Sequence, residues 1–126
     1  MERRILSTVL APSSPLFSQG IQVGSHVYVS GMTGMDVTTS TFGATVQDQT
    51  IQALRNCAAV IAEAGGNLDN VVQVTVLLAR PEDFAGMNEA YATVFASTPP
   101  TRAVAKLGVE LPEVLVSIMM TAHLDS

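Results

Sequence analysis

Charged side chains are scarce in this sequence, and so are the residues that build disulfides and metal sites. Only 13% of the 126 residues are charged and 48% are hydrophobic, whereas about 25% are charged in a typical soluble domain. The single cysteine, Cys57, excludes an intrachain disulfide framework and is typical of a reducing compartment, so we expect a cytoplasmic protein. The two histidines, His26 and His123, are too few for a convincing zinc site without clustered cysteines. We therefore expect neither a metal nor a cofactor.

The sequence also lacks the features that indicate a nucleic-acid or membrane partner. The net charge is −5 and the six Lys and Arg residues form no cluster, which argues against nucleic-acid binding. No apolar run approaches the roughly 18 residues of a membrane span, and residues 1–14 make a poor signal peptide because their apolar stretch is brief. We therefore expect the apolar surplus to be buried between subunits of an oligomer rather than in lipid.

Hydrophobic periodicity predicts one α+β domain over residues 1–126, in the order β-β-β-α-β-α-β-β. Gly24-Ser25 is typical of a hairpin turn between the second and third strands. Thr45 or Asp48 can cap the first helix, and Pro81 is typical of the first turn of the second. The predicted strands cover 3–8, 17–23, 26–32, 71–79, 101–109 and 114–124, and the predicted helices cover 46–64 and about 81–96.

The last predicted strand is apolar on both of its sides. Ile118 and Met120 would lie on one side, and Leu115 and Met119 on the other. Two helices can cover only one face of the sheet, so the second apolar face requires a partner. A second copy of the same chain is the simplest candidate.

Four segments together resemble a known family. They are SQGIQVG at 18–24, YVSGMTG at 28–34, FAGMNEAYATVF at 84–95 and PPTRAVAKLGVELP at 99–112. Each motif is short, but their order and spacing are similar to those of the Rid family (YjgF/YER057c/UK114), also described as endoribonuclease L-PSP-like. The similarity extends from about residue 5 to residue 124.

The resemblance implies the chorismate-mutase-like YjgF fold, in a homotrimer whose sheets form a central barrel with clefts between the subunits. It also implies that Arg102 binds the carboxylate of a 2-imino or enamino acid while water attacks the C=N carbon and releases ammonia. Phe17, Ser30, Val104 and Met119 would line the same substrate site. A planar guanidinium matches a carboxylate with two parallel hydrogen bonds, and imine hydrolysis needs no cofactor.

The sequence departs from the family pattern at three of these positions. Met119 occupies the place of the glutamate that holds or activates water in the active deaminases, and Ile118 and Met120 beside it are also apolar. Phe17 replaces a tyrosine. Val104 replaces a cysteine, at a position where the family uses mainly backbone atoms.

Two functional hypotheses therefore stand. The first is a deaminase of 2-imino acids with Arg102 as the carboxylate clamp. The second is a weakly active or non-catalytic homologue that binds small carboxylates in a regulatory or chaperone-like role. A ribonuclease is disfavoured by the pI of about 4.7.

Three residues keep alternative interpretations. Arg102 can instead form an ion pair between subunits. Asn88 is interpreted as a structural hydrogen-bonding residue, and Cys57 as a buried small hydrophobe.

Overall fold

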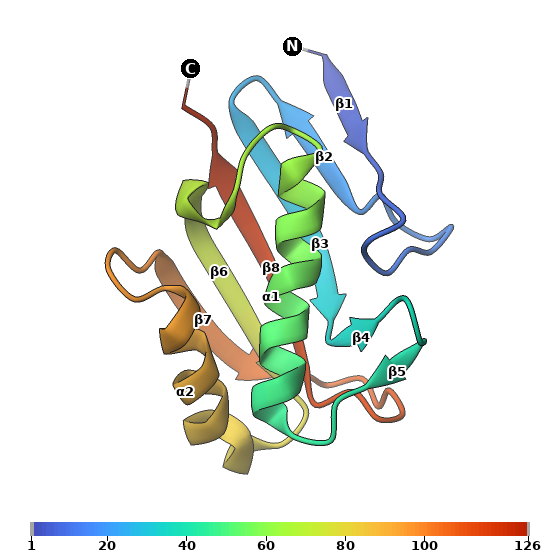
Figure 1. The fold of residues 1–126 in the computed structure, drawn as a ribbon, viewed down its shortest axis with the longest axis vertical. Helices are drawn as coiled ribbons and strands as arrows, with labels where there is room; N and C mark the ends of the chain where they lie inside the picture. The colour runs from blue at the N-terminus through green and yellow to red at the C-terminus, as the bar shows by residue number, and fades with distance from the viewer. Residues whose placement is uncertain (1, 126) are drawn as a thin grey trace.

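The computed structural model describes residues 2–125 and shows one mixed sheet covered on one face by two helices (Figure 1). The predicted α+β class is therefore confirmed. The six-stranded sheet has the order β1-β2-β3-β8-β6-β7, and a separate two-stranded hairpin joins β4 to β5. The strands are β1 (Arg3–Leu6), β2 (Gly20–Val23), β3 (His26–Thr33), β4 (Met35–Asp36), β5 (Thr41–Phe42), β6 (Val71–Leu78), β7 (Thr101–Lys106) and β8 (Val116–His123), and the helices are α1 (Val46–Ala62) and α2 (Phe84–Val94).

The chain forms α1 where the three-four spacing of apolar residues predicts it. The Thr45 side chain caps the helix by accepting a hydrogen bond from the backbone N–H of Asp48 at 3.1 Å. Beyond the helix end, Gly65 adopts a positive φ of 83°, which favours glycine. The apolar side of α1 is buried against β3 and β8. A Cβ on Gly20 would lie 2.5 Å from a Val60 methyl group, so this glycine lets β2 pass close beneath the helix.

Helix α2 makes the crossover between two parallel strands, β6 and β7, whereas the other pairs in the large sheet are antiparallel. Parallel neighbours cannot be joined by a hairpin and need such a crossover. Because β7 pairs only with β6, it is an edge strand. The strand β7 lies at the edge of the sheet beside α2 (Figure 1), and it carries Arg102.

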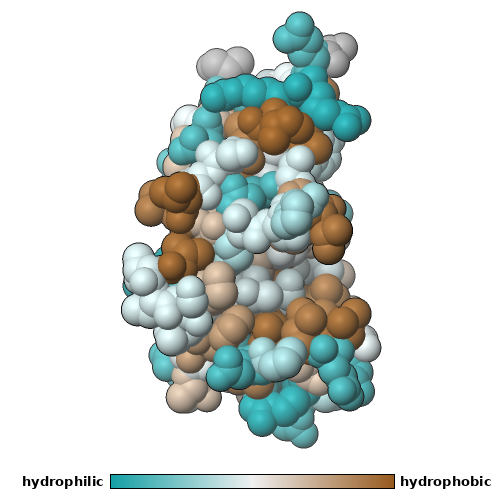
Figure 2. Space-filling model, turned by 90° about the vertical axis from the view of Figure 1, so that its right-hand side faces the viewer, coloured by the Kyte–Doolittle hydropathy of each residue, from teal (hydrophilic) through white to brown (hydrophobic). Residues whose placement is uncertain are grey.

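Side chains of the sheet alternate between a helix-covered face and an open face. Val76, Ile118 and Met120 are buried beneath the helices, whereas Tyr28 and Met119 on the open face are 49% and 47% exposed. The prediction of apolar side chains on a second sheet face is thus confirmed for β8. Figure 2 shows further hydrophobic patches on the side of the molecule that carries β1 and β2.

Several predicted boundaries were wrong. The second strand begins at Gly20, so Phe17 lies in a loop, bridged to Ser14. β7 ends at Lys106 and β8 starts at Val116, because the turn between them occupies more residues than expected and includes Glu113 at a φ of 67°. The segment 34–43, which lies outside all the predicted strands and helices, contains the β4–β5 hairpin. No helix within residues 2–125 has the length and apolar character needed to cross a membrane.

Candidate functional site

Arg102 lies on β7 with its side chain on the same face of the sheet as α2. It is the register partner of the buried Val74. Its Nη1 donates a hydrogen bond to Oδ1 of Asn88 at 2.7 Å, and its guanidinium carbon lies 4.9 Å from the centre of the Tyr91 ring. A guanidinium within about 6 Å of a ring centre is attracted to the face of that ring. These two contacts fix the direction of an exposed arginine side chain.

The sequence of α2 explains why both contacts come from one helix. Pro81 begins a short 3-10 turn that leads into α2 at Phe84. Asn88 and Tyr91 are three residues apart and so share one helix face. The structure confirms the prediction that Asn88 is a hydrogen-bonding residue.

Tyr91 contacts Arg102, which the sequence did not indicate. Its side chain is buried and its ring packs against Phe95 with a centroid distance of 4.8 Å. Its hydroxyl is buried without a hydrogen-bond partner among the described residues. Burial raises the pKa of Tyr91, and the nearby Arg102 charge opposes that shift. The three-residue spacing from Asn88 was the signal that could have linked Tyr91 to Arg102.

The charge of Arg102 has no anionic partner in residues 2–125. Within that range the single ion pair joins Arg80 to Asp83 at 3.0 Å. The hydrogen bond to Asn88 engages one of the five N–H donors of the Arg102 guanidinium. Neutral partners thus orient the cation without neutralising it, which leaves it suited to binding a carboxylate.

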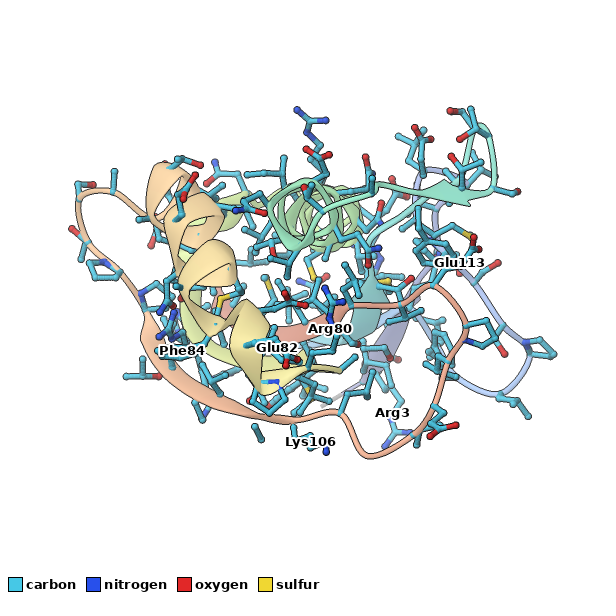
Figure 3. The ribbon with its side chains drawn as sticks, turned by 90° about the horizontal axis from the view of Figure 1, so that it is seen from below. Arg3, Arg80, Glu82, Phe84, Lys106 and Glu113 are labelled. Atoms are coloured by element: carbon cyan, nitrogen blue, oxygen red, sulfur yellow. The ribbon has the colours of Figure 1, made fainter. Side chains whose placement is uncertain are left out.

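Val104 follows Arg102 on the same face of β7 and is half-buried against the core. It borders a cavity of about 400 Å³ between β7 and the start of α2. Figure 3 labels Phe84 and Lys106, which line this cavity. The lining of this cavity therefore combines apolar side chains with the cationic Lys106.

Phe17 and Ser30 lie together near the opposite edge of the sheet. The Ser30 hydroxyl donates to the carbonyl of Ser18, and the Ser30 N–H donates to the carbonyl of Gln19 at 2.9 Å. The buried Gln19 side chain in turn bonds three carbonyls of the preceding loop, those of Thr8, Ala11 and Pro12. This network holds the loop that carries the half-exposed Phe17 beside β3.

Met119 lies on the open face of the central strand β8, opposite Thr75 of β6. It borders a cavity of about 190 Å³ together with Tyr28 and Thr75. The face that carries Met119 is therefore the reverse of the one that carries Arg102.

One chain thus does not assemble the five predicted site residues. Arg102 and Val104 lie together on β7, and Phe17 and Ser30 lie together near β2 and β3. The strands β8 and β6 separate these two groups. His123 shares the open face with Met119 but lies at the end of β8.

Comparisons with known proteins point to one family. The family model described as Endoribonuclease L-PSP matches residues 8–124. A Mus musculus protein named 2-iminobutanoate/2-iminopropanoate deaminase is 38% identical over 104 residues, which are 80% of this chain and 76% of the mouse protein. A RutC family protein of Saccharolobus solfataricus is 36% identical over 124 residues, which are 96% of this chain and 98% of that protein.

Solved structures show the same fold. Crystalline Escherichia coli TdcF with bound serine superimposes with a TM-score of 0.90 at 30% identity, covering 97% of this chain and 99% of TdcF. The Escherichia coli YjgF gene product superimposes with a TM-score of 0.89 at 27% identity, covering 95% of this chain and 98% of YjgF. The match to the family model and these relatives show that the chain belongs to the Endoribonuclease L-PSP family, the group of Rid and YjgF proteins.

Proposed function

We propose that the protein is a deaminase that hydrolyses 2-imino acids, and their enamine tautomers, to 2-keto acids and ammonia. The observation that carries this proposal is the Arg102 guanidinium, which is exposed and oriented by Asn88 and Tyr91 but lacks an anionic partner within residues 2–125. Two relatives support the substrate class. The mouse relative is named for 2-iminobutanoate and 2-iminopropanoate, and TdcF was crystallised with serine, a small amino acid with a carboxylate.

In this proposal Arg102 binds the substrate carboxylate through two parallel N–H donors. A water oxygen forms a bond to the imine carbon and gives up a proton, while the C=N π electrons move to nitrogen, which takes up a proton. In the resulting carbinolamine the hydroxyl proton passes to the amino nitrogen as the C=O bond forms and the C–N bond breaks. The products are a 2-keto acid and ammonia. Orientation of the substrate is the main contribution required of the protein, because free imines already hydrolyse in water.

The complete site is proposed to form between two chains of a homotrimer. The apolar open sheet face that includes Tyr28 and Met119 supports burial against another copy. Such packing would bring Phe17 and Ser30 of one chain to Arg102 of the next. We expect light scattering to give the mass of three chains.

Mixed trimers test the shared site. We expect Arg102→Ala and Phe17→Asp each to abolish activity as pure proteins. In trimers assembled at random from equal amounts of both variants, about one quarter of the sites combine an intact Arg102 with an intact Phe17. Recovery of about that share of wild-type activity supports the proposal, and no recovery contradicts a site shared between chains.

Deaminase activity is tested with imines that are generated in situ in the assay. An amino-acid oxidase generates 2-iminopropanoate or 2-iminobutanoate, and semicarbazide traps the imine that remains. We expect the protein to lower the trapped amount in proportion to its concentration. An unchanged amount with both short and bulky substrates contradicts the deaminase proposal.

A second proposal, a small-carboxylate-binding homologue without fast turnover, is favoured by Met119. No carboxylate side chain occurs between Glu113 and Asp125, so β8 offers no carboxylate as a general base. General-base assistance is typically worth about 10²–10⁴-fold in rate. Calorimetric binding of pyruvate that requires Arg102, together with imine loss at the background rate, would support this second proposal over the first.

A further inference from the structure

The two histidines of the chain face each other across neighbouring strands, although they lie at distant positions in the sequence. His26 begins β3, His123 ends β8, and the two are register partners. The Leu124 N–H donates to the Ser25 carbonyl at 2.7 Å just beyond the pair. This bond identifies a non-hydrogen-bonded pair, the antiparallel position at which opposing side chains are closest.

In the single chain both imidazoles are exposed at the end of the open face, and their rings meet edge to face with centroids 4.8 Å apart. No ring nitrogen of either histidine has a hydrogen-bond partner within residues 2–125. The Asn70 side chain instead donates to the backbone carbonyl of His123 at 3.4 Å, which ties this strand end to the loop before β6. The backbone therefore holds the two imidazole rings close to each other.

Although the sequence alone led us to expect no metal, we propose that His26 and His123 form a two-histidine chelate for a late first-row transition-metal ion. Two imidazole nitrogens that bind one ion at about 2.0–2.1 Å, in neighbouring coordination positions, place their ring centres about 4.5–5.1 Å apart. The observed separation of 4.8 Å falls within this range. Binding would require each ring to turn one nitrogen toward the shared ion. Water would complete the coordination shell.

The ligand set selects the metal. Imidazole suits copper, nickel and zinc, and among divalent first-row ions copper binds a given nitrogen site most tightly. No carboxylate faces the pair from its register positions. Its open-face neighbours are Tyr28, Thr121 and Val23, which disfavours the hard ions Mg²⁺ and Ca²⁺. The net charge of −5 adds a general attraction for cations.

Copper titration of the purified protein tests the chelate independently of imine hydrolysis. We expect one Cu²⁺ per chain by calorimetry, with an electron paramagnetic resonance spectrum that shows two equivalent imidazole nitrogens. His26→Gln and His123→Gln should each weaken binding at least about tenfold, because the chelate is lost. Tyr28→Phe is the matched control: its ring centre lies 6.3 Å from that of His26, and removal of its hydroxyl should leave binding unchanged.

The electron paramagnetic resonance spectrum of the Cu²⁺-bound wild-type protein tests the proposal even if a variant fails to fold. One coordinated nitrogen, or none, overturns the chelate whatever the variants do. The proposal is equally wrong if a folded protein without both histidines binds Cu²⁺ as tightly as the wild type, or if either single variant retains wild-type affinity. Acidification should weaken binding, since protons compete with the metal for imidazole nitrogen.

Discussion

Asn88 and Arg102 are joined by a 2.7 Å hydrogen bond in which the amide oxygen accepts from the guanidinium. The amide carries no charge, so it directs the guanidinium without competing electrostatically for the carboxylate that we propose as ligand. Tyr91 supports the same guanidinium from its ring face. In the proposed reaction, helix α2 would therefore act through Arg102, with Asn88 as a positioning residue.

Substitutions at Asn88 should distinguish positioning from structural support. Asn88→Ala frees the guanidinium to rotate, and we expect the KM for 2-iminopropanoate to rise several-fold with a smaller change in kcat. Asn88→Asp places a carboxylate on Arg102 and should raise KM further, because the new ion pair competes with the substrate. Steady-state kinetics measure both, with thermal unfolding as the control. Equal KM values for Asn88→Asp and the wild type would show that Asn88 does not position the clamp.

Met119→Glu should test what the missing glutamate contributes. Met119 is 47% exposed in the single chain and lies on the open face that we propose to pack against another copy, so the substitution would place a carboxylate between chains. If water activation limits the rate, we expect kcat to rise toward the roughly 10²–10⁴-fold range of general-base catalysis, and to fall again in acid as the new carboxylate is protonated. Met119→Gln is the control of similar shape without a base. Equal rates for the two variants would mean that another step limits turnover.

Tyr91 should tolerate loss of its hydroxyl but not of its ring. The hydroxyl is buried without a partner, so Tyr91→Phe should leave the free energy of unfolding unchanged or raise it by up to about 1 kcal/mol. Tyr91→Ala should lower it by about 3–5 kcal/mol through cavity formation. Urea unfolding measures both. A clear loss of stability in Tyr91→Phe would reveal a hydrogen bond that the structure does not contain.

The raised pKa of Tyr91 also predicts a pH dependence. The folded state retains the phenolic proton at pH values where the unfolded chain releases it, above the ordinary pKa of 10.0. The corresponding contribution to stability is complete below that value and is lost as pH rises through the folded-state pKa. Tyr91→Phe should therefore lose less stability than the wild type between pH 9 and pH 11 (roughly the window set by the tyrosine pKa). Parallel losses would contradict this assignment.

Cys57 should be inert in the folded protein. Its thiol is fully buried and contacts the carbonyl oxygen of Ile118 at 3.5 Å, and burial raises its pKa. We expect a colorimetric disulfide reagent to titrate no thiol in the native state and one thiol per chain in denaturant. Rapid labelling of the native protein would show that α1 opens locally.

The sequence predicted the secondary-structure elements well where capping residues and apolar periodicity determine their bounds. Helix α1 begins where its Thr45 cap was expected, and β3 lies within one residue of its predicted bounds. The boundaries failed near Phe17 and Glu113, where backbone turns rather than apolar periodicity end the strands. The sequence could not show how Arg102 is oriented, because its contacts with Asn88 and Tyr91 depend on the packing of α2 against β7.

The sequence also could not show that the predicted site residues lie in separate parts of the sheet. The family pattern indicates Arg102, Phe17 and Met119 as one set, but the strand order and the alternation of side chains place them at different edges and faces of the sheet. The pairing of His26 with His123 likewise follows from the antiparallel register of β3 and β8. Residue types can be predicted locally, whereas such long-range neighbours depend on topology.

The central claim is that the Arg102 guanidinium binds the carboxylate of a reactive imine. The most direct measurement is the rate of 2-iminopropanoate hydrolysis by the wild type and by Arg102→Gln, which keeps hydrogen-bonding capacity without the charge. We predict acceleration by the wild type, and a rate for folded Arg102→Gln that equals the uncatalysed background. Wild-type acceleration that survives in Arg102→Gln would contradict the carboxylate clamp.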